Sequence, residues 1–196
     1  MRRTQKTAAK RAADIAKPKK QPAVTERPGS WHLARTETER RLTDFEFGLE
    51  RLAQAYYRWK AACLAAVCDV PLTGDDVAVL NVVRMGDEPK RLSEIGQLLN
   101  RVDVPNLQYA TRKLVRAGLI ETEGSSSRKE TRYRATITGC SVTEAYAALR
   151  AATLPPMLDA LDGWAAKSEI TSIHLDLVSS LYAQAAQVAI TRRHQP

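Results

Sequence analysis

Residues 92–120 read LSEIGQLLNRVDVPNLQYATRKLVRAGLI, and this segment indicates two helices joined by a short turn. Ser93 is a suitable N-cap for a short first helix, which carries Ile95, Leu98 and Leu99 on one face. The pattern therefore predicts a helix-turn-helix, with the connection in residues 100–102.

The second helix is predicted over residues 104–117, with Asp103 as its N-cap and Gly118 as its stop in the left-handed conformation. The apolar spacing places five residues inward, namely Val104, Leu107, Thr111, Leu114 and Val115. The positions between them then face outward. Those outward residues are Asn106, Gln108, Tyr109, Arg112 and Lys113.

An extended pair, residues 119–123 and 131–137, is predicted to form a hairpin after this helix. Polar and apolar residues alternate along its second half, and Arg132 and Arg134 share the polar face. The tip presents Arg128 and Lys129. A capping box, Thr73-Gly-Asp-Asp76, opens another helix upstream, which Gly86 ends.

The order helix, helix, turn, helix, hairpin is that of a winged helix-turn-helix, in which the second helix of the motif enters the major groove of DNA. The charge distribution fits a polyanionic partner. Of a net charge of +8, residues 1–30 carry +7 and residues 90–134 carry +5, with acidic excess elsewhere.

The basic tail, residues 1–34, is expected to be disordered because it holds almost no large aliphatic residues. A solubility extension and a non-specific nucleic-acid arm are equally weighted interpretations of it.

Long helices are predicted on both sides of the winged domain. The first runs from near Thr36 to Val67 and repeats apolar residues in alternating steps of three and four, which favours a helix packed on another helix. These residues are Leu42, Phe45, Leu49, Leu52, Tyr56, Trp59, Cys63 and Ala66. At about 45 Å such a helix exceeds the needs of one small domain, so part of it is expected to serve a subunit interface.

In the C-terminal third, a capping box at residues 141–144 predicts a helix through about Thr153. Pro155-Pro156 is expected to break or sharply kink it. Ser168 is the predicted cap of a last helix. The apolar face of that helix comprises Ile170, Ile173, Leu177, Leu181 and Val188.

The chain resembles the MarR family of transcription regulators between Leu72 and about Glu144. The matching segments are Leu72–Leu80, Leu92–Leu99, Lys113–Ile120 and Ile137–Gly139. The resemblance implies a homodimer that binds a near-palindromic operator in double-stranded DNA and releases it when a small-molecule effector binds. The family wing usually holds an Asp-Arg pair, whereas this chain has Ser127-Arg128, so the arginine carries over without its acidic partner.

The predicted fold is therefore mainly α, a winged helix-turn-helix with a two-stranded wing (residues 71–138) flanked by a helical dimerisation region (residues 35–70 and 139–192). Asn106, Gln108, Tyr109 and Arg112 are predicted to read base edges, and Lys113 to contact phosphate. Arg128, Lys129 and Arg132 are predicted to contact the DNA backbone or minor groove.

Several function classes are disfavoured. The three histidines lie far apart, and no Gly-rich phosphate loop, zinc-ligand motif or nucleophile elbow is present, so neither an enzyme nor a cofactor or metal site is predicted. Cys63, Cys68 and Cys140 are interpreted as small buried residues rather than redox sensors. With no secretory signal and no apolar run long enough for a membrane, a cytoplasmic location is expected.

The alternative function is a winged module that binds RNA or protein.

Overall fold

The structure is a computed structural model that describes residues 31–124 and 131–193. The chain divides into two units, residues 1–55 and 56–196. Residues 1–30 and 125–130, which include most of the predicted basic tail and both wing-tip cations Arg128 and Lys129, lie outside the described residues.

In the first unit, helix α2 (Glu37–Ala65) begins at a capping box. The Thr36 hydroxyl accepts the Glu39 amide at 3.2 Å, and the Glu39 carboxylate accepts the Thr36 amide at 2.8 Å. Trp31 precedes the helix, and its ring lies 5.1 Å from that of Phe47. The predicted start of the long first helix is therefore confirmed.

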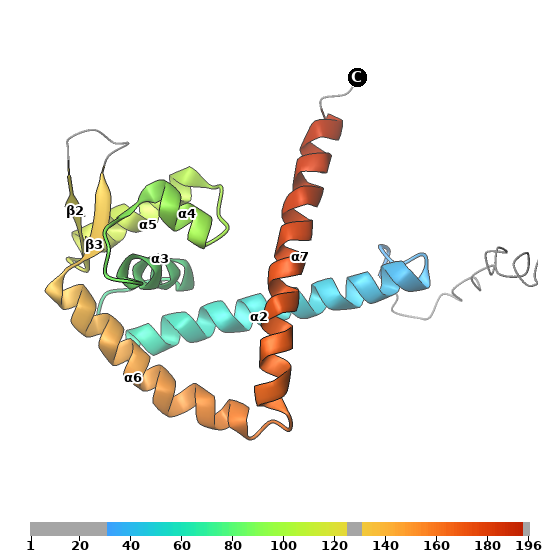
Figure 1. Cartoon of the computed structure of the whole chain (residues 1–196), viewed down its shortest axis with the longest axis horizontal. Coiled ribbons are helices and arrows are strands. Elements are labelled where there is room, and N and C mark those ends of the chain that lie inside the picture. Colours follow the sequence, from blue (N-terminus) through green and yellow to red (C-terminus); the bar gives the residue numbers. More distant parts are fainter. Residues whose placement is uncertain (1–30, 125–130, 194–196) are drawn as a thin grey trace, which may run out of the picture. The chain divides into compact units, whose positions relative to one another are not determined.

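The second unit contains the remaining elements (Figure 1). In chain order they are α3 (Gly74–Arg84), β1 (Lys90–Arg91), α4 (Leu92–Leu98), α5 (Val104–Arg116), β2 (Ile120–Glu123), β3 (Arg132–Ala135), α6 (Ile137–Asp159) and α7 (Trp164–Arg193).

Helices α3, α4 and α5 pack around one core, with the small sheet against them (Figure 1). Its buried residues are Val79, Leu80, Val83, Ile95, Leu107, Ala110, Leu114, Leu119 and Ile120. The predicted capping box of α3 is present, with the Asp76 amide donating to the Thr73 hydroxyl at 3.2 Å. Gly118 ends α5 with a φ of 69°, as predicted.

The predicted two-stranded wing is confirmed as the antiparallel pair of β2 and β3. The sheet has a third strand that was not predicted, β1, and its strand order is β1-β3-β2. Lys90 pairs with Tyr133 and Arg91 with Arg132. Because residues 90–91 form this strand, α4 begins with Arg91 as its N-cap rather than Ser93. The Arg91 amide, which has no carbonyl partner within the helix, donates a hydrogen bond to the Glu94 carboxylate at 2.7 Å.

Two of the five residues predicted to face inward on α5 are exposed. Val104 is 49% exposed and Val115 is 37% exposed, whereas Ala110 is buried. The buried stripe steps through residues 107, 110, 111 and 114, and Val115 lies one position past it. Val104 stands at the first position of the helix, beyond the reach of the core.

Helix α6 begins earlier and ends later than predicted. Thr136 is its N-cap, accepting the Gly139 amide at 3.0 Å, and the predicted cap Ser141 lies inside the helix. The helix continues through Pro155 and Pro156 to Asp159. Proline has a helical φ, so the cost falls on two missing donors and on ring crowding, and the helix tolerates both within its last turns.

Helix α7 starts at Trp164, directly after Gly163, whose φ is 69°. The predicted cap Ser168 therefore lies within the first turns, where its hydroxyl donates to the Ala165 carbonyl at 3.0 Å. No residue of α7 is buried. None of the helices in residues 31–124 and 131–193 is both long and apolar enough to cross a membrane.

Candidate nucleic-acid interface

The outer face of α5 is the first feature of the candidate interface. Because Leu107, Ala110 and Leu114 face the core, the residues between them turn outward. Asn106, Tyr109 and Arg112 are exposed, and Tyr109 is 62% exposed. Gln108 and Lys113 are half-buried at the edges of this face. The helix thus presents an exposed polar stripe in steps of three residues.

The exposed side chains on this stripe differ in their contacts. Within residues 31–124 and 131–193, Tyr109 and Arg112 make no hydrogen bond or ion pair. Asn106 donates from Nδ2 to the Asp103 carboxylate at 3.0 Å. Of the four predicted base-reading residues, Tyr109 and Arg112 are thus exposed without such a contact in the described part of the chain, Asn106 is held by Asp103, and Gln108 is half-buried.

Lys113 is held by an ion pair across the domain. Its Nζ lies 2.7 Å from the carboxylate of Asp76, which is almost fully buried and also belongs to the α3 capping box. This contact fastens α5 to the start of α3. The Lys113 side chain as a whole remains 28% exposed.

The described cations of the wing are engaged with the protein itself. Arg132 donates to the Pro89 carbonyl at 3.0 Å. Arg134 lies 2.9 Å from the Glu121 carboxylate and 4.0 Å from that of Glu123, so its charge is largely balanced on the sheet.

Lys90 has a structural role at the end of α3. Its ammonium is buried and donates to the carbonyls of Met85 and Glu88, the latter at 3.0 Å. A cation at this position interacts favourably with the carbonyl end of the helix. The charge of the central segment is therefore not all presented to a partner.

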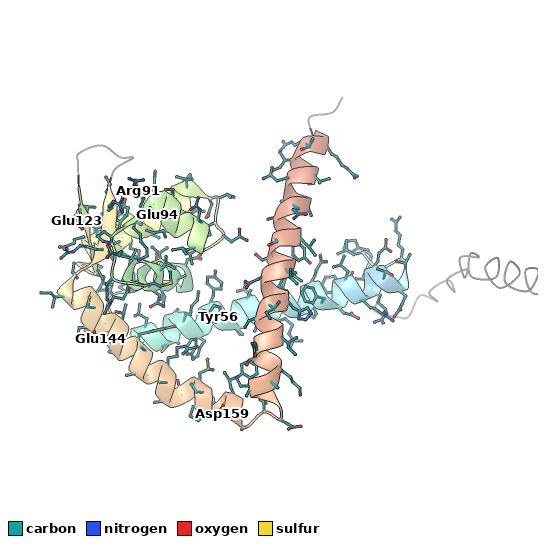
Figure 2. All side chains as sticks on the ribbon, viewed as in Figure 1. Tyr56, Arg91, Glu94, Glu123, Glu144 and Asp159 are labelled. Carbon is teal, nitrogen blue, oxygen red and sulfur yellow. The ribbon has the colours of Figure 1, made fainter. Side chains whose placement is uncertain are left out.

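Two exposed cations complete the surface, and the sequence reasoning missed both. Arg116 follows Arg112 by four residues on α5, a spacing that could have identified it. Arg91 lies on β1, which the local pattern did not reveal. Figure 2 shows Arg91 and Glu123 at the same end of the sheet, and in the register both flank Arg132.

The turn before α5 is strongly electrostatic. Arg101 contacts Asp103 through two nitrogens, at 2.9 and 2.6 Å, and lies 3.4 Å from the Asp75 carboxylate. These hydrogen bonds hold the pKa of Asp103 well below its usual range. The Asp103 carboxylate is therefore ionised at any pH near neutrality.

A pocket of about 550 Å³ lies beside α3 and α6 in the second unit. Its walls include three aromatic rings, Tyr56, Trp59 and Tyr146, and the arginines Arg84 and Arg150. Burial raises the pKa of Tyr146 to about 12, so its hydroxyl stays neutral. Cys63 lies next to Tyr146 in the core, and burial raises the pKa of its thiol, which disfavours the reactive thiolate.

Comparison with known proteins agrees with this architecture. Residues 72–139 match the family described as winged helix DNA-binding domain. No curated protein sequence matches the chain. Residues 72–139 are therefore a winged helix domain. Beyond it, the likeness to solved structures extends into the flanking helices.

AbfR of Staphylococcus epidermidis is 18% identical, with a TM-score of 0.59 over 76% of this chain and 96% of its own. Sco5413, a MarR family transcriptional regulator from Streptomyces coelicolor, is 19% identical, with a TM-score of 0.56 over 71% and 95%. The transcriptional repressor CouR, bound to a 23-mer DNA duplex, is 21% identical, with a TM-score of 0.56 over 70% and 94%. At these identities the likeness concerns the fold, and it covers the winged helix domain with its flanking helices.

Proposed function

We propose that this protein is a transcription regulator that binds specific sequences of double-stranded DNA as a homodimer, with α5 as the reading helix. The observation that carries the proposal is the outer face of α5, where Asn106, Tyr109 and Arg112 are exposed beside a buried stripe of the same helix. A helix held in this way can enter a major groove about 12 Å wide. CouR, which shares the fold, is bound to a DNA duplex.

Chemical roles can be assigned to most residues on the proposed surface. Asn106 and Gln108 can bond bidentately to adenine, and Arg112 can do so to guanine. Lys113, Arg132 and the wing-tip residues Arg128 and Lys129 are the proposed backbone or minor-groove contacts. Arg91 and Arg116 join them as exposed cations.

The proposal is tested by selecting bound sequences from a pool of random duplexes with the wild type and with Arg112→Ala. The wild type should select a two-fold related sequence. Arg112→Ala should lose preference at one base pair per half-site, by about 1–3 kcal/mol, because a bidentate contact to guanine is removed. Arg41→Ala, which removes an exposed cation from α2, is the matched control and should select the wild-type sequence.

The rival function is a winged module for RNA or protein. It predicts tighter binding to single-stranded RNA than to duplex DNA, or no nucleic-acid binding, in a shift assay over a range of salt concentrations. Selection of a random, non-symmetric pool by the wild type would contradict the proposed function.

Support for a homodimer comes from apolar residues that the single chain leaves in solvent. In the first unit, Leu42, Phe45 and Leu52 of α2 are 51%, 41% and 59% exposed. In the second unit, α7 exposes apolar residues along its whole length. Helices with apolar residues on several sides are normally buried, and a second copy of the chain would cover them. The response to an effector stays a prediction.

A further inference from the structure

Asp103, the N-cap residue of α5, does not use its carboxylate to cap the helix. The carboxylate of an N-cap aspartate normally accepts a hydrogen bond from the backbone amide two or three positions into the helix. Here Pro105 occupies the second position and has no amide proton, and the Asn106 amide donates to the Asp103 carbonyl at 3.1 Å. The Asp103 carboxylate is therefore free to accept hydrogen bonds from side chains.

Two side chains share that carboxylate. Arg101, whose side chain is only 17% exposed, donates one hydrogen bond to each oxygen of the Asp103 carboxylate. Such a bidentate ion pair fixes the orientation of the carboxylate and balances its charge. Asn106 donates one N–H to the Oδ2 atom at 3.0 Å. Arg101 also lies 3.4 Å from Asp75 of α3, so the carboxylate is anchored to the body of the domain.

The held N–H fixes the orientation of the Asn106 amide. A free asparagine amide rotates so that its oxygen and nitrogen exchange places, and it has two N–H donors. With one N–H on Asp103, the carbonyl oxygen and the other N–H remain for a ligand. That pair of groups matches the acceptor and donor that adenine presents in the major groove.

We propose that Arg101 and Asp103 are positioning residues, which orient the Asn106 amide so that it distinguishes one base pair of the target. The proposal rests on the proposed function, because it assigns a role within the reading helix. Neither residue touches the base. Their effect on recognition passes entirely through the orientation of Asn106.

The test uses Asp103→Ser in the full chain. Serine is as good an N-cap as aspartate, so α5 should still start normally, but it cannot hold Arg101 and Asn106 together. Affinities are measured for the selected duplex and for duplexes changed at each base pair of a half-site. We expect preference at one base pair to fall about tenfold, with the other preferences and the salt dependence unchanged.

Two further variants separate positioning from general damage. Asn106→Ala should lose preference at the same base pair, and combining it with Asp103→Ser should add no further loss, because both act on one contact. Arg101→Gln should affect that base pair as well. Asp69→Ser, which removes an exposed acid outside these elements, should keep every preference.

An equal drop in affinity for all duplexes, or additive losses in the double variant, would overturn the positioning role. Unchanged preference in Asp103→Ser, with the wild type still selective, would overturn it without affecting the proposed function. A wild type without sequence preference would overturn both.

Discussion

Gly139 packs directly against the backbone of the segment before β2. A Cβ atom at this position would come within 1.9 Å of the Leu119 carbonyl oxygen, which also accepts the Thr136 amide. The glycine in the Ile137-Thr-Gly139 segment, one of those that resemble the MarR family, thus has a physical reason. It allows the start of α6 to lie directly against the backbone of the segment before β2.

Replacing Gly139 by alanine should therefore destabilise the fold, although alanine normally stabilises a helix. We expect a loss of about 1–3 kcal/mol in the free energy of unfolding, as for other overpacked sites, measured by urea denaturation. Gly48→Ala is the control, because Gly48 lies within α2 with no atom near its Cβ position, and it should gain up to about 1 kcal/mol. Equal gains in both variants would show that the contact with Leu119 relaxes freely.

At the site, helical periodicity predicted which residues face outward but not what holds them. The exposure of Asn106, Tyr109 and Arg112 follows from the buried positions between them, which the sequence displays. The ion pair of Lys113 with Asp76 joins residues 37 positions apart, and no local pattern announces such a contact. The same limit applies to Arg132 and the Pro89 carbonyl.

Among the elements, those with local signals were predicted and those made by distant pairing were not. The capping box at Thr73 and the stop at Gly118 are written in adjacent residues. Strand β1 has only two residues and exists because Tyr133 and Arg132 pair with it. Its presence moves the start of α4 from Ser93 to Arg91, so one missed long-range contact explains two errors.

Helix α6 offers a test of how proline is tolerated near a helix end. Pro155 and Pro156 remove the donors that would bond the carbonyls of residues 151 and 152. The double variant Pro155→Ala/Pro156→Ala should raise the free energy of unfolding by about 1–3 kcal/mol, less than two interior prolines would give. Thermal denaturation followed by circular dichroism measures it.

Pro71→Ala is the control for α6, because Pro71 is exposed and lies outside the helices. Removing a loop proline frees the unfolded chain and should leave stability unchanged or lower. A drop in stability for the α6 variant as well would mean that the prolines stabilise the helix end through packing.

At the scale of the whole molecule, α7 is the element that a single chain accounts for least. None of its 30 residues is buried. Four large apolar residues of one stripe, Ile170, Ile173, Leu177 and Leu181, are each more than half exposed. A stripe of this length is costly to leave in water, at roughly 25 cal/mol for each Å² of apolar surface. The dimerisation role proposed for α7 follows from this exposure.

The double variant Leu177→Glu/Leu181→Glu should convert the protein to monomers. Both side chains are about 60% exposed in one chain, so the charges should leave the fold of the chain intact, but burying them against a second copy would be unfavourable. Light scattering should give a mass near one 21.7 kDa chain for the variant and near twice that for the wild type. Gln184→Glu, an exposed polar change on the same helix, should remain dimeric.

The monomer should also bind the selected duplex more weakly than the dimer, because each chain can occupy only one half-site. A variant that stays dimeric at micromolar concentration would place the interface elsewhere than on this stripe of α7.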